Sequence, residues 1–541
     1  MRQFPYRNTG RILGENVYNY LSGEAGIIVD PKDPNLARQN PADYINGFIA
    51  SVKKAAKTAQ KDPDFQADRI VGIGVDTTGS TPIPVDVNGV PLAFQERFTN
   101  NPNAYAWLWK DHTSFAEAEE ITEWAKKRPE QFVRLCGGTY SSEWYWSKIL
   151  HSMRVDSKVA QAAASWVELA DFVPGWITGN QNPDNLVRGI CAAGHKALYN
   201  DEWGGLPSEE ALAQLDKRLC RFRYNAKAVS VDHSAGSLTA DMAKKIGVPA
   251  GIPVAAGAID CHLGAVGCGV KPGTLVQTIG TSSCDVMVSP LAEPLGAIPG
   301  LCGIVPESVL PGMYGLEAGQ SAVGDIYNWF VLRLTPSEFT RGGNAHASLT
   351  AEAKKLAPGA SGLIALDWNN GNRTILVDQQ LTGLILGQTI RTTAPEIYRA
   401  LVESTAFGAL TIINRLEEYG IRVKEVVNCG GIAEKNDFVM QLYADVCNRP
   451  MKISRCPQTC ALGAAIAGAV VGGAYKTFPA AMRNMTGVKE KVYRPHKEAA
   501  KVYARLYTLY RRLHDAFGNT DISVDLHSIM KDLLAIRRNA R

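Results

Sequence analysis

The stretch AAGAIDCHLGAVGCGVKPGTLVQTIGTSSCDVMV, residues 255–288, decides how the rest of the chain is interpreted. It sets one acid, Asp260, among small residues, and then predicts two short strands, 275–279 and 284–288, joined by the turn Gly280-Thr281-Ser282-Ser283. The backbone N–H and side-chain O–H groups of such a turn can hold one anion. The stretch therefore predicts a phosphate site on the turn and a base at Asp260. A glycine-rich domain junction with an N-capping Asp is the alternative interpretation.

The composition indicates large folded domains. Hydrophobic residues make up 45% and charged residues 20% of the 541 residues, so the chain can bury large cores. The net charge is only +4 and forms no basic stripe, so nucleic acid is not an expected partner. The longest apolar run, residues 461–474, is too short and too rich in Gly and Ala to span a bilayer, so we expect a tightly packed helix and no membrane partner.

Cysteine and histidine usage points to a reducing compartment. The chain has 11 Cys without a CxxC pair and 9 His without an HExxH motif, and it lacks a secretory signal. We therefore expect free thiols, a cytoplasmic protein and no zinc site, and we assign no residue as a metal ligand.

Residues 71–86, VGIGVDTTGSTPIPVD, form a second unit of strand, small polar turn and strand. Asn88-Gly89 then predicts a hairpin into residues 90–94. Two such units in the two halves of the chain predict an α/β protein with a cleft between two lobes.

Eight of the ten Trp residues lie between residues 107 and 203, interleaved with polar side chains. Aromatic faces beside polar groups suit a sugar, whose C–H faces are apolar and whose edges carry hydroxyls. Burial in a core is the alternative for each Trp, and for any single one it is favoured.

Two further turns lie in the second half of the chain. Glu317 precedes a turn of small residues that leads into a helix, so it is either a polar ligand contact or a helix cap. Gly430-Gly431 follows the predicted strand 423–429 and precedes a helix near Asn436, which lets a nucleotide approach the backbone closely. An ordinary α/β connection is the alternative. P-loop, Rossmann and GxSxG motifs are absent.

These motifs together resemble the FGGY carbohydrate kinases, and within them the ribulokinase branch. The matching segments run in family order over nearly the whole chain: 71–86, NPNAYAWLWKDHT (101–113), YSSEWYWSKILH (140–151), AGHKALY (193–199), GAIDCHLGAVG (257–267), IGTSSCD (279–285), GLEAGQSAVGDIYNWF (315–330), CGGIAEKN (429–436) and CALGAAIAGAV (460–470).

The resemblance implies the two-lobed, actin-like (ribonuclease-H-like) ATPase fold, which closes on ATP–Mg²⁺ and sugar in the cleft between the lobes. We expect a sugar-binding lobe over residues 1–268, a nucleotide-binding lobe over 269–475 and a helical C-terminal appendage over 476–541. Family members also suggest a homodimer.

The resemblance assigns roles to particular residues. Asp260 falls on the catalytic base. The sugar-contacting positions are Lys196 and Glu317, with the turn Thr78, Gly79 and Ser80 nearby, and the ATP-binding positions are Gly280, Thr281, Ser282, Gly430, Gly431 and Asn436.

The implied reaction is the ATP-dependent phosphorylation of a ketopentose, with L-ribulose converted to L-ribulose 5-phosphate in L-arabinose catabolism. Three alternatives stay open: a non-catalytic sugar- or nucleotide-binding relic, a kinase for another pentulose or a pentitol, and an actin-like ATPase with a protein partner.

The chain departs from the family at its start. Family members open with a strand–turn–strand whose Asp and glycine–hydroxyl turn supply the first phosphate loop, and no such pattern precedes Gln39. Asp30 is followed by Pro31, which has no N–H to offer. We therefore expect that the chain as written begins about thirty residues late by comparison with that pattern, and that it folds poorly or has very little kinase activity.

Overall fold

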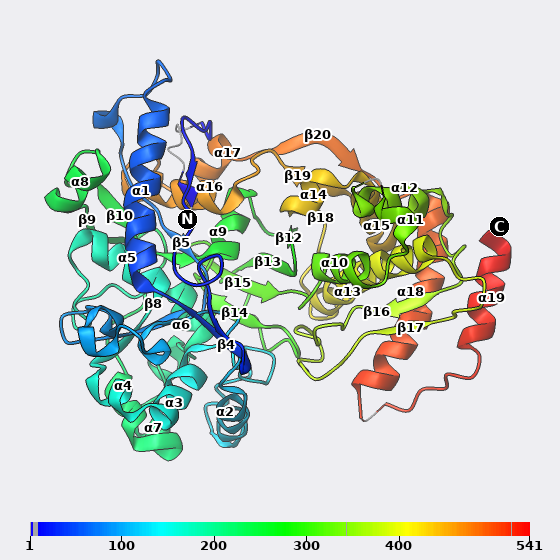
Figure 1. Ribbon diagram of the computed structural model, residues 1–541, viewed down its shortest axis with the longest axis horizontal. Coiled ribbons are helices and arrows are strands. Elements are labelled where there is room, and N and C mark those ends of the chain that lie inside the picture. Colours follow the sequence, from blue (N-terminus) through cyan, green and yellow to red (C-terminus); the bar gives the residue numbers. More distant parts are fainter. Residues whose placement is uncertain (1, 4–8, 342, 521, 541) are drawn as a thin grey trace.

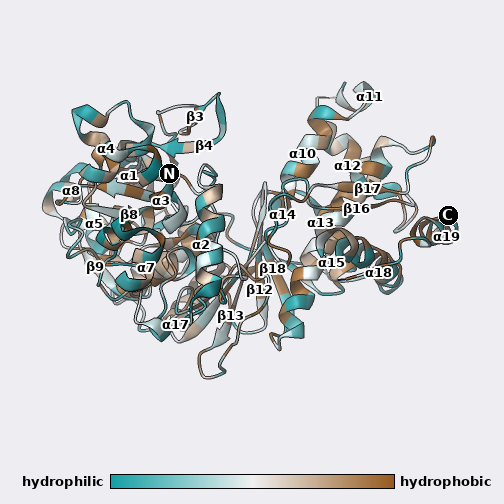
Figure 2. Ribbon diagram, turned by 90° about the horizontal axis from the view of Figure 1, so that it is seen from below, coloured by the Kyte–Doolittle hydropathy of each residue, from teal (hydrophilic) through white to brown (hydrophobic). Residues whose placement is uncertain are grey.

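A seven-stranded mixed sheet forms the centre of the second half of the chain, in the order β14-β15-β13-β12-β18-β19-β20. The computed structural model describes residues 2–3, 9–341, 343–520 and 522–540, so Met1 and Arg541, the outer ends of the expected domains, lie outside the described residues. Figure 1 shows the chain as two lobes, with α1 to α8 in one and α10 to α15 in the other. In the perpendicular view of Figure 2, β12, β13 and β18 lie between the helices of the two lobes.

The first lobe consists of short strands and many helices. Its strands are β1 (Arg2–Gln3), β2 (Asn16–Val17), β3 (Ile28–Asp30), β4 (Asp33–Gln39), β5 (Asp76–Thr77), β6 (Pro82–Val85), β7 (Ala106–Trp107), β8 (Ser165–Glu168), β9 (Ser234–Ser237), β10 (Pro253–Ala255) and β11 (Ala258–Ile259). Its helices are α1 (Pro41–Ala59), α2 (Phe115–Lys127), α3 (Tyr145–Val155), α4 (Ser157–Ala162), α5 (Leu169–Thr178), α6 (Ile190–Lys196), α7 (Glu209–Asp216), α8 (Ala240–Ile246) and α9 (Asp260–Gly267).

The second lobe surrounds the large sheet with longer helices. Its strands are β12 (Thr274–Ile279), β13 (Ser283–Pro290), β14 (Gly303–Pro306), β15 (Met313–Ala318), β16 (Ile364–Leu366), β17 (Leu384–Leu386), β18 (Glu425–Cys429), β19 (Met451–Ser454) and β20 (Val488–Tyr493). Its helices are α10 (Gly324–Arg333), α11 (Ser337–Thr340), α12 (Ala345–Lys355), α13 (Ala394–Glu418), α14 (Gly431–Lys435), α15 (Asp437–Cys447), α16 (Thr459–Val471), α17 (Phe478–Met485), α18 (Lys497–Gly518) and α19 (Ile529–Ala540).

The sheet brings the two expected nucleotide turns to one edge. β12 pairs with β13 in antiparallel fashion through the turn at residues 280–282, and it pairs in parallel with β18, Thr278 lying opposite Cys429. Because parallel strands end at the same edge of a sheet, the turn after β12 and the Gly430-Gly431 turn after β18 lie next to each other. A Cβ added to Gly430 would lie 2.4 Å from the carbonyl oxygen of Ile279.

Strand pairing in the first lobe is discontinuous. The sequence predicts one strand over residues 69–76, but the named strand β5 covers only Asp76–Thr77, and Ile73 forms an isolated bridge to Val254. Within the described part of the chain, residues 73–77 pair only with residues 254–259. β6 pairs with β8, and the Asn88-Gly89 turn forms a short hairpin in which Val85 bridges Pro91, after which Leu92–Phe94 form a 3₁₀ turn in place of a longer strand.

Helices α9 and α16 pack closely at the junction of the lobes. A Cβ on Gly463 of α16 would lie 1.8 Å from the carbonyl oxygen of Leu263 in α9, so the small residues allow the two backbones to approach. The tightly packed helix predicted from the Gly/Ala run is therefore confirmed. This packing fixes α9, and with it Asp260.

The C-terminal segment, residues 476–541, is expected from the sequence to be a helical appendage. In the structure β20 extends the large sheet beside β19, and α18 places Tyr503, Leu506 and Tyr510 in the core of the second lobe. No helix within the described ranges is both long and apolar enough to cross a membrane.

Candidate active site

Asp260 is the first residue of α9, directly after the short strand β11. β11 runs parallel to β5, with Ala258 opposite Asp76 and Ile259 opposite Thr77. The two strands therefore end at the same edge and place Asp260 beside the turn that starts at Thr78. One carboxylate oxygen of Asp260 accepts a hydrogen bond of 2.7 Å from the backbone N–H of Cys261.

A cavity of about 970 Å³ opens beside Asp260. Most of its wall is apolar and comes from α1, the segment 70–75 and α16. Asp76, Thr77, Thr78 and Asp260 supply polar groups to the same cavity. The base position thus borders a large, partly open cavity.

Burial governs the acidity of both carboxyl groups at this edge. Burial and the nearby charge of Asp260 raise the pKa of Asp76 to about 7. Burial also raises the pKa of Asp260, against the opposing effects of the Cys261 N–H and His262. A carboxylate whose pKa is shifted towards neutrality is a stronger base, which suits proton abstraction.

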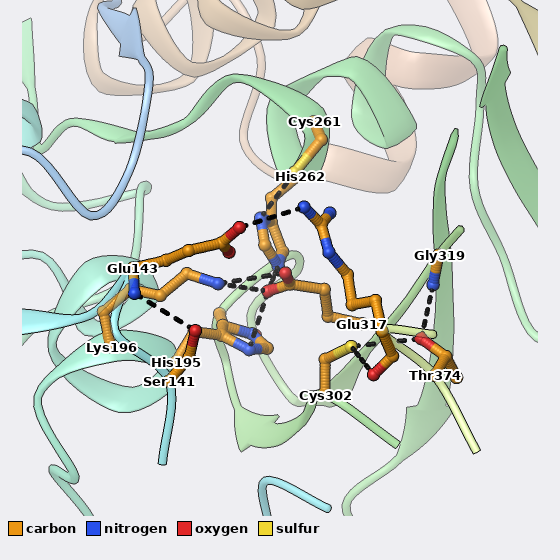
Figure 3. A network of polar contacts seen from close by, with 12 residues as sticks. Ser141, Glu143, His195, Lys196, Cys261, His262, Cys302, Glu317, Gly319 and Thr374 are labelled. Carbon is orange, nitrogen blue, oxygen red and sulfur yellow. Dashed lines mark hydrogen bonds and ion pairs between the residues drawn. The ribbon is translucent and has the colours of Figure 1, made fainter. Parts of the chain in front are cut away.

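Lys196 and Glu317 form a buried ion pair between the two halves of the chain (Figure 3). Lys196 ends α6 and Glu317 lies in β15, and the ammonium nitrogen is 2.9 and 3.0 Å from the two carboxylate oxygens. Burial alone would raise the pKa of Glu317, but Lys196, His195 and His262 outweigh it and hold the pKa far below its ordinary value. Burial alone would lower the pKa of Lys196, but Glu317 raises it.

Two histidines complete this cluster. His195 Nδ1 lies 3.3 Å and His262 Nε2 lies 3.5 Å from the same oxygen of Glu317, Oε2. The ring centroids are 4.4 Å apart. Figure 3 shows Lys196 and both imidazoles directed at Glu317. His262 directly follows Cys261 in α9, so the cluster is built on the same helix as the base position.

The turn Thr78-Gly79-Ser80 is tied into the first lobe. The Ser80 hydroxyl is fully buried and donates to a carboxylate oxygen of Glu168, and Lys148 donates to the Ser80 carbonyl at 2.9 Å. The Thr78 hydroxyl lies 3.1 Å from that of Thr81. Ser80 therefore holds the turn in place, whereas Thr78 lines the cavity beside Asp260.

The turn Gly280-Thr281-Ser282 is held by the start of α10. The backbone N–H groups of Val323 and Asp325 donate to the Thr281 carbonyl, at 2.7 and 3.1 Å. Thr281 itself is exposed. A Cβ on Gly280 would meet only the Ser282 carbonyl oxygen, at 3.9 Å, so space is open beside the turn.

Gly430, Gly431 and Asn436 flank the short helix α14. Gly430 has φ +94°, which favours glycine, whereas a Cβ on Gly431 would meet nothing within 4 Å. The Asn436 side chain caps α15 by accepting from the Val439 N–H at 3.2 Å. Gly431 thus faces open space, while Gly430 and Asn436 shape the backbone around it.

The structure brings the predicted residues together in two groups. Asp260, Thr78, Lys196 and Glu317 belong to one, which lies between the lobes, and the turns at 280–282 and 430–431 form the other, at the sheet edge. The Cys284 thiol, just after the turn at 280–282, donates to the Cys261 thiol, which is next to the base Asp260. This contact connects the two groups.

The tryptophans are mostly core residues. Trp107, Trp146 and Trp166 are fully buried in an aromatic cluster of the first lobe. Trp144 alone among the eight contacts a predicted sugar residue, with the Lys196 ammonium 5.4 Å from its ring centroid. Trp144 thus lies beside Lys196, and sugar contact by the Trp residues as a group stays a prediction.

Sequence reasoning missed Asp76, His195 and His262. His195 precedes Lys196, and His262 lies two residues after Asp260, so their neighbours in sequence were a usable signal. Asp76 follows the apolar run 70–75, a position at which polar side chains of parallel strands meet.

Comparisons with known proteins match both halves of the chain. The N-terminal domain of the FGGY family of carbohydrate kinases matches residues 21–267, and the C-terminal domain of that family matches residues 275–471. The ribulokinase of Vibrio parahaemolyticus is 40% identical over 524 residues, which is 93% of this chain and 92% of that protein. The ribulokinase of Halalkalibacterium halodurans is 38% identical over 98% of this chain and 94% of that protein.

Solved structures support the same fold. Xylulose kinase from Rhodospirillum rubrum superposes with a TM-score of 0.76 at 22% identity, over 94% of this chain and 95% of that chain. Glycerol kinase from Plasmodium falciparum, solved with ADP, gives a TM-score of 0.75 at 16% identity, over 97% and 96%. The two lobes therefore have the expected two-lobed sugar-kinase architecture.

Proposed function

Because the chain belongs to the FGGY family of carbohydrate kinases, we propose that it transfers the γ-phosphoryl group of ATP to a ketopentose, converting L-ribulose to L-ribulose 5-phosphate. The observation that carries the proposal is Asp260, a carboxylate of raised pKa that shares helix α9 with the cluster around Lys196 and Glu317. The ribulokinases among its relatives support the choice of sugar.

Asp260 acts as the general base. It accepts the proton of the sugar hydroxyl as that hydroxyl attacks the γ-phosphorus in line. Its hydrogen bond from the Cys261 N–H uses one oxygen and orients the carboxylate. Asp260 lies at the junction of the lobes, and closure of the lobes around the substrates would limit competition from water.

Lys196 and Glu317 bind the sugar as a donor and an acceptor held side by side. The ammonium group has three N–H bonds and directs two of them at Glu317, so one remains for a sugar oxygen. Glu317 stays ionised and can accept from a sugar hydroxyl. Thr78 lines the cavity beside Asp260, and Ser80 supports the turn that contains Thr78 and Gly79 through Glu168.

The turns at the sheet edge are suited to ATP. Open space beside Gly280 and Gly431 would admit phosphates and the adenosine close to the backbone, and Thr281 and Ser282 add hydroxyl donors. Asn436 shapes the second turn. Carboxylate oxygens are the ligands that Mg²⁺ prefers, so Asp76 and Asp260 fit the ion that accompanies ATP, whose charge would neutralise the phosphates.

We further propose a division into a sugar-binding lobe over residues 1–268, a nucleotide-binding lobe over 269–475 and a C-terminal segment over 476–541 that packs on the second lobe. All 11 cysteines are free thiols, which supports a cytoplasmic location. A homodimer is proposed from the family alone.

A substrate panel tests the proposed function. Purified protein with ATP and Mg²⁺ is assayed for ADP release with L-ribulose, D-ribulose, D-xylulose, ribitol and no sugar. We expect the largest kcat/KM with L-ribulose and negligible release without sugar. Sugar-independent ADP release, or none with any member of the panel, contradicts the proposal.

A further inference from the structure

We propose that His195 and His262 are positioning residues for sugar recognition: both imidazoles present an N–H to Glu317 Oε2 and so reserve Oε1 for a single sugar hydroxyl. The inference rests on the proposed function and deepens it. It states why the Lys196–Glu317 pair offers the sugar one hydrogen-bond donor, on Lys196, and one acceptor, on Glu317.

The cluster is assembled from both halves of the chain. His195 and Lys196 end α6 and His262 lies in α9, whereas Glu317 enters from β15 of the second lobe. His195 and His262 are 2% and 0% exposed, so water does not satisfy their ring nitrogens. A Cβ on Gly303 would lie 2.1 Å from His195 Nδ1, so only glycine at that position leaves room for the ring.

Both ring nitrogens are closest to Glu317 among the ion-pair contacts. His195 Nδ1 and His262 Nε2 lie 3.3 and 3.5 Å from Glu317 Oε2 without completing a hydrogen bond of good geometry within the described residues, and Cys191 also interacts with His262. If these nitrogens carried lone pairs, two lone pairs would face an ionised carboxylate oxygen at 3.3 and 3.5 Å. Such an arrangement is repulsive, so the buried geometry requires a proton on each of them.

Neighbouring hydroxyl and thiol groups supply that tautomer without an extra charge. His195 Nε2 lies 2.9 Å from the Ser308 hydroxyl, whose proton is also within 3.1 Å reach of the Val305 carbonyl; donation to Nε2 in place of Val305 leaves Nδ1 as the N–H. His262 Nδ1 lies 3.4 Å from the Cys261 thiol, which can donate in the same way and leave Nε2 as the N–H. Cys261 in turn accepts from Cys284.

The two imidazoles differ in acidity. Burial alone would lower the pKa of His262, but Cys191 and Glu317 raise it, so His262 can carry a proton on both ring nitrogens. Burial and the proximity of His262 lower the pKa of His195 well below its ordinary value. His195 is therefore neutral near pH 7, and its N–H is set by the tautomer alone.

His195, His262 and Glu317 also have the composition of a metal site. Lys196 argues against that use, because its ammonium lies within 3.0 Å of both oxygens of Glu317 and would repel a divalent cation at the same carboxylate. Two N–H donors satisfy the same atoms without that repulsion.

The consequence for recognition follows from counting bonds. Oε2 accepts from Lys196 and has His195 Nδ1 and His262 Nε2 at 3.3 and 3.5 Å, whereas Oε1 accepts from Lys196 alone among the described residues and keeps one acceptor direction. One free N–H of Lys196 and one free acceptor direction of Oε1 are then adjacent. A carbonyl and a hydroxyl on neighbouring carbons, the α-hydroxy ketone of a ketose, match this arrangement.

Matched substitutions at each histidine test the proposal. A side-chain amide can replace one ring nitrogen. His262→Gln keeps an N–H near the Nε2 position, and His195→Asn keeps an N–H near the Nδ1 position. His262→Met and His195→Leu remove the N–H at each position. The dissociation constant of L-ribulose is measured by calorimetry without ATP, alongside KM for both substrates and the thermal midpoint of each variant.

We expect the donor-free variants to weaken L-ribulose binding and raise its KM by about tenfold or more, with KM for ATP within about twofold of the parent. The amide variants are expected to stay within about threefold for both substrates. Equal sugar affinities for His262→Gln and His262→Met, in variants that both fold, overturn the proposal. So does stoichiometric zinc in the purified parent protein, because a metal then occupies the two nitrogens.

Binding measured without ATP separates this inference from the proposed function. A parent protein that binds L-ribulose without phosphorylating it contradicts the proposed function only, and the ranking of the variants still decides the inference. A parent protein that binds no ketopentose contradicts both.

Discussion

Lys196 Nζ lies 2.9 Å and 3.0 Å from the two carboxylate oxygens of Glu317, and this buried ion pair joins the first lobe to the second. It lies at the lobe junction, where α6 and α9 of one lobe meet β15 of the other. The pair therefore contributes both to sugar recognition and to the relative position of the lobes.

Removing one member of this pair should destabilise the protein. Glu317→Gln leaves the Lys196 ammonium buried without a counter-charge, and the free energy of unfolding should fall by about 3–5 kcal/mol. Adding Lys196→Met removes the stranded charge, so the double variant should be more stable than Glu317→Gln alone. Urea unfolding of both single variants and the double variant measures the coupling, and additive losses would contradict the account.

Replacing the base should separate chemistry from binding. Asp260→Asn preserves size and polarity but cannot take a proton, so kcat should fall by about 100- to 10,000-fold. The calorimetric affinity for L-ribulose should stay within about threefold of the parent value. An Asp260→Asn variant with near-parental kcat would show that the proton goes elsewhere.

The buried carboxyl of Asp285 in β13 should make stability depend on pH. Burial raises its pKa from 3.8 to about 7, so between these values the folded state binds more protons than the unfolded state, and stability falls as pH rises. Asp285→Asn removes this effect. The free energy of unfolding of Asp285→Asn should equal that of the parent at pH 4 and exceed it by roughly 1–4 kcal/mol above pH 7.

Exposed Asp201 provides the control for that experiment, because Asp201→Asn changes the same charge without burial. Its stability difference from the parent should stay small and flat with pH. A difference for Asp285→Asn that does not grow between pH 4 and pH 8 would rule out the buried, proton-retaining carboxyl.

The two neighbouring glycines after β18 should respond differently to alanine. Gly430 has φ +94° and its added Cβ would meet the Ile279 carbonyl oxygen at 2.4 Å, so Gly430→Ala should lower the free energy of unfolding by about 2 kcal/mol or more. Gly431 has open space at its Cβ, so Gly431→Ala should fold normally, within about 0.5 kcal/mol.

If the open space beside Gly431 receives the nucleotide, Gly431→Ala should raise KM for ATP by about tenfold and leave KM for L-ribulose unchanged. Thermal unfolding and initial rates measure both effects. An unchanged KM for ATP would move the nucleotide away from this turn.

Local chemistry in the sequence predicted the elements that depend on it. The glycine–hydroxyl turn at 280–282 does join β12 and β13. The helix near Asn436 and the close packing of the Gly/Ala helix α16 are also confirmed. Each depends on residues within one short segment.

Features that depend on distant partners were not predicted. The Asn88-Gly89 turn does form, because the Asp86 N–H donates to the Val90 carbonyl and Val85 bridges Pro91, but the long ladder of β6 is with β8, about eighty residues further along the chain, which buries β6 completely. Ser80 looked like a ligand contact, but its hydroxyl is used by Glu168. His195 and His262 become a cluster only when β15 brings Glu317 between α6 and α9. The spacing of residues along the sequence does not predict contacts between segments that are so far apart in the chain.

The identity of the product tests the central claim most directly. Purified protein is incubated with ATP, Mg²⁺ and L-ribulose, and the phosphorus NMR spectrum is followed with time beside the Asp260→Asn variant. The account predicts that ADP and the phosphate monoester of L-ribulose at its 5-hydroxyl appear in equal amounts, and that the variant forms neither at a comparable rate. Release of inorganic phosphate without a sugar phosphate, or equal product formation by the Asp260→Asn variant, would contradict it.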